Sequence, residues 1–138
     1  MANTPQKRVF EFRLDLHSGV PVYRQIIDQV LGGIAGGTLT AGHQLPTVRQ
    51  VAVDLAINPN TVLRAYRELE IRGVLETQQG SGTFISQQKV RRDEVERQRQ
   101  LVQLAGEFVS RAGAAGFTIE ELQEQLQEYS VDGGKKRR

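Results

Sequence analysis

The chain begins with an alternation of apolar and mostly polar residues over residues 9–16. Its apolar side carries Phe10, Phe12, Leu14 and Leu16. A period of two is typical of a strand that buries one face, and Ser18 and Gly19 then favour a turn. We therefore expect a half-buried strand before the first helix.

Three segments with helical spacing follow. The first begins at Pro21, ends at Gly36 and Gly37, and carries apolar residues at Val22, Ile26, Ile27, Val30, Leu31 and Ile34. After an expected loop over residues 38–45, Pro46 and Thr47 begin a second helix that runs through Leu55. A tight turn over residues 56–59 leads to a third helix over residues 60–72, before Gly73. Two short helices joined by so short a turn predict a helix-turn-helix.

Two short apolar runs after the third helix predict a β-hairpin. Residues 74–78 and 83–86 form its strands, and residues 79–82 form its tip. Gly80 and Gly82 lie where a hairpin tip needs positive φ. A hairpin directly after a helix-turn-helix is a wing.

The last part of the chain predicts two amphipathic helices without a core of their own. A charged stretch over residues 89–99 leads into an apolar stripe that ends at residues 113–116. Thr118 and Glu121 have the spacing of a capping box, and Phe117 is placed to pack on Leu122. The two stripes must be buried on each other, on the winged domain or on a second copy of the chain, and we favour the second copy. The expected dimerisation residues are Leu101, Val102, Ala105, Phe108, Val109, Ile119, Leu122 and Leu126.

These elements predict an α+β, mainly α-helical protein. We expect a winged helix-turn-helix DNA-binding domain over residues 1–86, a helical dimerisation region over residues 87–132 and a flexible basic tail over residues 133–138. The four basic residues that end the chain, from Lys135 to Arg138, are expected to be a solvated tail that adds at most weak affinity for phosphate.

Composition narrows the function classes. The 138 residues include no cysteine and only two histidines, His17 and His43, which stand far apart. Thiol chemistry is therefore excluded, and we expect no metal, no cofactor and no enzymatic activity. No apolar run is long enough for a membrane span and the first residues are too polar for a signal peptide, so a cytoplasmic location is expected. A net charge of +2 does not by itself indicate nucleic-acid binding, so the position of the charges decides.

Four motifs carry a family resemblance. They are P-V-Y-R-Q-I at residues 21–26, L-P-T-V-R-Q-V-A at 45–52, N-P-N-T-V-L-R-A-Y-R-E-L-E at 58–70 and G-S-G-T-F at 80–84. Over residues 20–86 the chain resembles the GntR family of bacterial transcription regulators, and its N-P-N-T-V motif and short tail are most similar to the YtrA subfamily. The resemblance implies a homodimeric repressor on a double-stranded, pseudo-palindromic operator, often autoregulatory and linked to transporter genes.

The third helix is the expected recognition helix, because short polar side chains at its beginning suit the major groove. The DNA-contact candidates on the two helices are Thr47, Arg49, Asn58, Asn60, Thr61, Arg64 and Arg67; at the wing they are Gln79, Gly80, Ser81, Gly82 and Thr83. The role of Arg49 follows from the family resemblance. Many relatives carry arginine at position 59 and a basic residue at position 63, whereas this chain has Pro59 and Leu63. That departure favours Asn60, Thr61 and Arg64 as the base-reading residues.

Several alternatives remain at this point. Asn58 and Thr61 are also typical turn and cap residues, and Tyr23 is expected to be a packing residue. Arg67 is as well suited to pairing with Glu68 or Glu70, or to being solvated, as to contacting DNA. A small-molecule effector, if there is one, would bind at the dimer interface or between the tail helices and the winged domain. Rival functions are a protein-binding adaptor and the regulatory head of a larger aminotransferase-like enzyme.

Overall fold

The computed structural model describes residues 10–87 and 93–130. Its internal contacts divide the chain into two compact units, Met1–Gln88 and Lys89–Arg138. The expected basic tail, the start of the charged stretch and Val9 lie outside the described residues.

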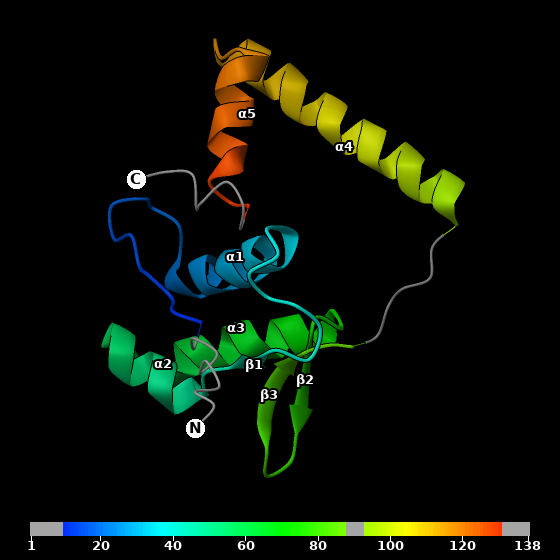
Figure 1. The fold of residues 1–138 in the computed structure, drawn as a ribbon. Coiled ribbons are helices and arrows are strands. Elements are labelled where there is room, and N and C mark those ends of the chain that lie inside the picture. Colours follow the sequence, from blue (N-terminus) through cyan, green and yellow to red (C-terminus); the bar gives the residue numbers. More distant parts are fainter. Residues whose placement is uncertain (1–9, 88–92, 131–138) are drawn as a thin grey trace, which may run out of the picture. The chain divides into compact units, whose positions relative to one another are not determined.

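Helices dominate the described residues, which form five helices and three strands (Figure 1). The first unit contains α1 (Val22–Ala35), β1 (Gln44–Leu45), α2 (Val48–Leu55), α3 (Pro59–Ile71), β2 (Leu75–Gln78) and β3 (Gly82–Ile85). The second contains α4 (Glu94–Ala114) and α5 (Ile119–Gln127). The strands pair antiparallel in the order β1-β3-β2, so the expected mainly helical, winged fold class is confirmed.

The helix-turn-helix is delimited by local hydrogen bonds. Thr47 caps α2, where its Oγ1 accepts from the Gln50 amide while the Gln50 side chain accepts from the Thr47 amide. Asn58 caps α3 by accepting from the Asn60 amide, and Pro59 fills the first helical position. Between the two helices Ala56 adopts the left-handed conformation, with φ 54°. The predicted limits of both helices are therefore confirmed to within a residue or two.

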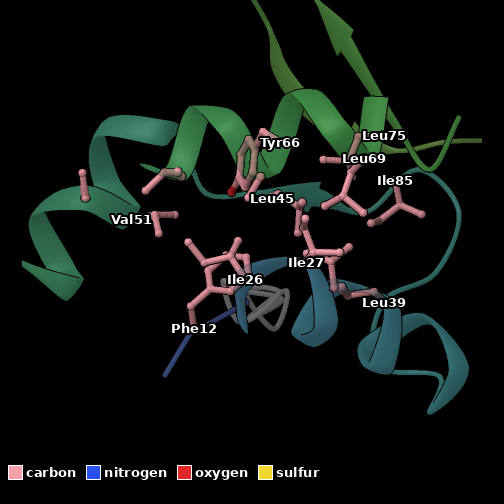
Figure 2. Close-up of a cluster of buried hydrophobic side chains, with 14 residues drawn as sticks. Phe12, Ile26, Ile27, Leu39, Leu45, Val51, Tyr66, Leu69, Leu75 and Ile85 are labelled. Carbon is pink, nitrogen blue, oxygen red and sulfur yellow. The ribbon is translucent and has the colours of Figure 1, made fainter. Parts of the chain in front are cut away.

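One apolar core holds the first unit together (Figure 2). Ile26, Ile27 and Val30 of α1 pack with Val62, Tyr66 and Leu69 of α3, and the sheet adds Leu45, Leu75 and Ile85. Tyr66 is 1% exposed, and its hydroxyl donates a 2.6 Å hydrogen bond to the Pro46 carbonyl. This bond joins the middle of α3 to the residue that precedes the cap of α2.

The strand expected over residues 9–16 is wrong within its described part. Phe12 is buried and Phe10 half-buried as the alternation predicted, but the segment pairs with no strand. Instead two glutamine side chains of α1 bond its backbone. Gln29 accepts from the Arg13 amide and donates to the Arg13 carbonyl at 2.9 and 2.6 Å, and Gln25 does the same for Asp15 at 2.9 Å each.

The loop expected over residues 38–45 is wrong at its end. Gln44 and Leu45 form β1, which pairs with Phe84 and Thr83 of β3. Two residues are too few to show a period in the sequence, and they become a strand because the hairpin offers β3 as a partner.

The second unit is a corner of two helices. At the end of α4, the Phe117 amide bonds the Ala112 carbonyl and the Gly116 amide bonds the Gly113 carbonyl, with Gly116 at φ 86°. This pattern is a Schellman motif, which ends the helix and turns the chain. The predicted capping box of Thr118 and Glu121 then starts α5 and is confirmed.

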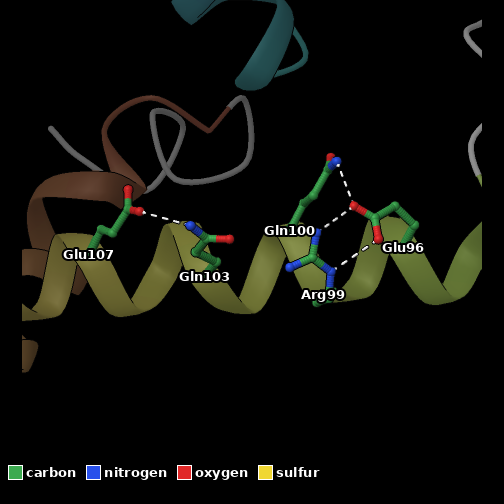
Figure 3. Close-up of polar contacts among 5 residues, drawn as sticks. All are labelled: Glu96, Arg99, Gln100, Gln103 and Glu107. Atoms are coloured by element: carbon green, nitrogen blue, oxygen red, sulfur yellow. Dashed lines mark hydrogen bonds and ion pairs between the residues drawn. The ribbon is translucent and has the colours of Figure 1, made fainter.

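The polar side of α4 carries bonds within the helix itself (Figure 3). Glu96 accepts from Arg99 and Gln100, and Gln103 bonds Glu107. These residues recur at spacings of three and four, which places them on one side of the helix. The apolar residues of α4 are therefore left on another side.

Candidate nucleic-acid interface

The exposed side of α3 forms a shallow hollow with the beginning of α1. Its walls include Asn60, Leu63, Arg64 and Arg67 of α3 together with Tyr23 of α1, and its volume is about 520 Å³. Three of the predicted recognition residues are thus brought together at one surface. Thr61 is half-buried and its amide bonds the Asn58 carbonyl.

Arg64 is stacked on an aromatic ring. Its guanidinium carbon lies 3.7 Å from the centroid of the Tyr23 ring, a cation–π contact. Tyr23 is half-buried against the core, as its expected packing role requires, whereas Arg64 is exposed. Sequence spacing could not reveal this contact, since the two residues belong to different helices.

The arginines of the first unit differ in their partners. Arg24 pairs with Asp28 at 3.3 Å and Arg72 with Glu68 at 3.2 Å. Arg49, Arg64 and Arg67 are exposed and form no ion pair with any residue that the structure describes.

Of the roles open to Arg67, the structure does not support an ion pair with Glu68 or Glu70. Glu68 is occupied by Arg72, and Glu70 accepts instead from the Thr77 hydroxyl. The guanidinium of Arg67 therefore stays available on the face of α3.

Asn58 is confirmed as a cap and Thr47 proves to be another, whereas Thr61 lies inside α3 and caps neither helix. Both caps are still able to bond a ligand. The Thr47 Oγ1 accepts one cap bond and keeps its own hydrogen, and the Asn58 side chain uses only its oxygen. A hydroxyl donates as well as accepts, and an amide NH₂ carries two donors. Capping and phosphate binding are therefore compatible at both positions.

The wing tip has the backbone that its glycines predict. Gly80 and Gly82 have φ of 81° and 127°, and the Ser81 amide bonds the Gln78 carbonyl. Gln79, Gly80 and Ser81 are exposed, whereas Thr83 is half-buried in the sheet. Gln44, which sequence reasoning placed in a loop, supports the tip by donating from Nε2 to the Ser81 carbonyl at 3.0 Å.

Most apolar residues of α4 and α5 are left exposed. None of the residues of α4 and α5 is buried within the chain, although Leu101, Val102, Phe108, Val109, Ile119 and Leu126 are large and apolar. Ala105 is also exposed, and Leu122 is half-buried. Between the two helices lies an open hollow of about 720 Å³ whose lining includes Phe108, Phe117 and Leu122.

Two features are absent from the part of the chain that the structure describes. Over residues 10–87 and 93–130, no three acidic, histidine or cysteine side chains gather as metal ligands would. No helix in these same ranges has the length and apolar character that crossing a membrane requires.

Comparison with known proteins decides the family. The sequence pattern of "Bacterial regulatory proteins, gntR family" matches residues 22–85. The HTH-type transcriptional repressor YtrA of Bacillus subtilis is 36% identical over 126 residues, which span 90% of this chain and 97% of the relative. The chain belongs to the GntR family.

Solved structures place it near the YtrA type of GntR regulator. YtrA from Sulfolobus acidocaldarius, a GntR-family transcription factor, matches with a TM-score of 0.51 at 31% identity over 68% of this chain and 95% of that one. A transcriptional antiterminator from Listeria monocytogenes EGD-e matches with a TM-score of 0.64 at 30% identity over 91% and 94% of the two chains. This GntR protein is thus a DNA-binding transcription regulator, and the family and function class expected from its motifs are confirmed.

Proposed function

We propose that this GntR protein is a homodimeric repressor that binds a pseudo-palindromic operator. Each copy places the beginning of α3 in the major groove and its wing in the adjacent minor groove. The observation that carries the proposal is the exposed face of α3, where Asn60, Arg64 and Arg67 lie beside one another and both arginines lack a described carboxylate partner.

The residues at this face suit different parts of the DNA. Asn60 and Arg64 carry the amide and guanidinium groups that pair in a bidentate way with adenine and guanine, and Thr61 offers a methyl group to thymine. Thr47, Arg49 and Asn58 suit phosphates, because they lie where α2 and α3 begin. Arg67, one helical turn beyond Arg64, suits a phosphate at the edge of the groove.

The wing supplies the second contact. Gly80, Ser81 and Gly82 present backbone without bulky side chains, which allows close approach to a groove, and Gln79 and Thr83 flank them. The hydrogen bond from Gln44 holds this tip in place before DNA arrives, so that less freedom is lost on binding.

Residues 87–132 join two copies of the chain in this proposal. Apolar side chains on α4 and α5 that remain about half exposed in one copy, such as Phe108 at 49% and Leu126 at 55%, gain a dry surface when a second copy covers them. Two-fold symmetry of the dimer then matches the symmetry of the operator.

The protein acts on transcription in the cytoplasm and has no catalytic role in this proposal. Its relatives are named as a transcriptional repressor and a transcriptional regulator. A small-molecule effector would bind at the dimer interface, next to the apolar hollow lined by Phe108 and Phe117.

The test is DNA affinity measured across a salt series. The full chain is titrated onto the DNA upstream of its own gene, onto a site selected from a random library, and onto scrambled DNA of the same length. We expect strong preference for the selected site, about 10³-fold or more, and a steep loss of affinity with salt. Equal, weak affinity for all three DNAs would contradict the proposal and favour a protein-binding adaptor.

Arginine variants assign the roles. Arg64→Ala is expected to cost about 1–3 kcal/mol and to relax selectivity at one base pair, as loss of a base contact does. Arg49→Ala is expected to weaken specific and scrambled DNA alike and to flatten the salt dependence, as loss of a phosphate contact does. Arg24→Ala is the matched control, because Arg24 already has a carboxylate partner.

A further inference from the structure

The stack of Arg64 on Tyr23 has a role beyond packing. We propose that Tyr23 is a positioning residue for DNA recognition: its ring is a platform that fixes the Arg64 guanidinium in the orientation that reads the operator. The inference rests on the proposed function, in which Arg64 meets the DNA.

The geometry separates a fixed partner from a movable one. Tyr23 is the second residue of α1 and is half-buried against the core, so its ring is held in place. Arg64 is exposed on α3, and its guanidinium carbon lies 3.7 Å from the centre of that ring. A long, flexible side chain is thereby restrained by a short, rigid one from another helix.

A neighbouring ion pair prevents Glu68 from drawing the Arg64 guanidinium away from the Tyr23 ring. Glu68 lies four residues beyond Arg64 on α3, where a carboxylate would ordinarily pair with an arginine. Here Glu68 is engaged by Arg72 at 3.2 Å. The contact places the guanidinium carbon over the Tyr23 ring, and Arg64 keeps its charge without a carboxylate partner among the described residues.

This arrangement suits bidentate recognition of a base. An unrestrained arginine loses side-chain freedom when it binds, and that loss reduces affinity. A guanidinium already held over a ring has lost part of that freedom, and no described carboxylate has to be displaced before its N–H donors bond a base. Tyr23 therefore sharpens the contact without touching the DNA.

A double-mutant cycle on the full chain tests the inference. Binding to the selected operator is measured for the wild type, Tyr23→Leu, Arg64→Ala and the double variant, with Tyr23→Phe as the matched control that keeps the ring. We expect Tyr23→Leu to weaken binding about two- to fivefold in the wild type, the range of an exposed cation–π contact, and not in the Arg64→Ala background. Tyr23→Phe is expected to bind like the wild type.

Thermal unfolding of each variant shows whether a change in DNA affinity comes from loss of the contact or from loss of the fold. Should Tyr23→Leu fail to fold, Tyr23→Met serves in its place, since methionine fills the site without a π face. Equal losses from Tyr23→Leu in both backgrounds would overturn the inference, and so would a loss in Tyr23→Phe as large as that in Tyr23→Leu, which would indicate a hydroxyl contact. Both outcomes leave the proposed function standing, whereas a wild type without operator preference would overturn the two together.

Discussion

A single phenol hydroxyl, that of Tyr66, ties the two helices of the DNA-binding motif together. It donates to the Pro46 carbonyl, one residue before the Thr47 cap of α2, while its ring fills the core next to Phe12. The position of Arg49 relative to α3 thus depends on a bond made inside the core. Burial also raises the pKa of Tyr66 above its ordinary value of 10.0, because the interior disfavours phenolate.

Tyr66→Phe is expected to change stability with a sign that depends on pH. At pH 7 the variant loses one buried hydrogen bond and is less stable by about 1 kcal/mol. Above pH 10 the Tyr66 phenol of the unfolded wild type releases its proton, whereas the raised pKa keeps the folded wild type protonated. The free energy of unfolding of the wild type therefore falls by about 1.4 kcal/mol per pH unit above pH 10 and is unaffected below it. The variant lacks this proton and shows no such fall. Urea unfolding from pH 7 to pH 11.5 should therefore show the difference closing and then reversing.

The exposed tyrosine supplies the comparison for this experiment. Tyr129 is 61% exposed, and Tyr129→Phe is expected to leave the stability of the first unit unchanged at every pH. A constant difference between wild type and Tyr66→Phe across the range would contradict the buried, protonated phenol.

At the scale of elements, the two glutamines of α1 replace a β-strand. Gln25 and Gln29 are one helical turn apart, so their side-chain amides reach alternate residues of the extended segment, Asp15 and Arg13. A primary amide carries an N–H donor and a C=O acceptor, as a peptide group does. Each glutamine side chain can therefore bond both the backbone N–H and the backbone C=O of one residue.

The variant Gln25→Leu, Gln29→Leu is expected to release this segment. Six hydrogen bonds are lost, four to the backbone of Arg13 and Asp15 and two from Gln25 to the Ser18 hydroxyl and the Val20 carbonyl. Because these bonds are exposed, each is worth the lower part of the usual range of about 0.5–1.5 kcal/mol, and we expect the free energy of unfolding to fall by about 3–5 kcal/mol. Amide exchange of Arg13 and Asp15 should accelerate as well. Arg24→Ala on the same helix removes only an exposed ion pair and should cost about 0.5 kcal/mol or less. Unchanged exchange at Arg13 would contradict the role of the glutamines.

The bonds from Gln25 and Gln29 show which parts of the fold the sequence predicts and which it does not. Helix starts follow from local chemistry, so Asn58 and Thr118 were recognisable as caps, and Pro46 with Thr47 marked the beginning of α2. The alternation around Phe12 correctly predicted that one side of the segment is buried. Burial of side chains, however, does not reveal which groups form hydrogen bonds with the backbone. The partner proved to be a pair of side chains, and β1 likewise depends on a neighbour distant in sequence.

The candidate site divides in the same way. Arg64 and Asn60 were predicted from their place at the beginning of a recognition helix and from the motif around them. Tyr23 and Gln44 were missed as supports, because each acts on a residue 37 or more positions away, through a stack and a hydrogen bond that no spacing rule contains. Only the folded chain brings such pairs together.

At the scale of the whole molecule, the proposed dimer explains why exposed apolar residues are present on α4 and α5. In the proposed function, one winged domain covers a half-site and binds it with modest affinity. Joining two domains makes the second binding event intramolecular, which raises affinity by about 10²- to 10⁴-fold without a new contact to the DNA. The tail helices would thus contribute to affinity without touching the DNA.

Phe108→Glu is therefore expected to separate dimerisation from DNA recognition. A carboxylate on the apolar side of α4 makes burial against a second copy unfavourable, so sedimentation should report a monomer. Affinity for a half-site should stay unchanged, and affinity for the full operator should fall by about 10²-fold or more. Gln103→Glu adds the same charge on the polar side of α4 and should remain dimeric.

Removal of the residues after Ser86 also tests whether the tail helices carry the dimer interface, and it adds no charge. A chain that ends after Ser86 keeps the first unit almost whole and should be a folded monomer with half-site affinity. A dimeric fragment would place the interface on the winged domain. If the fragment is monomeric but the Phe108→Glu variant is still a dimer, the interface lies in the tail helices but does not include Phe108. The apolar face of α4 around Phe108 would then not be needed for dimerisation.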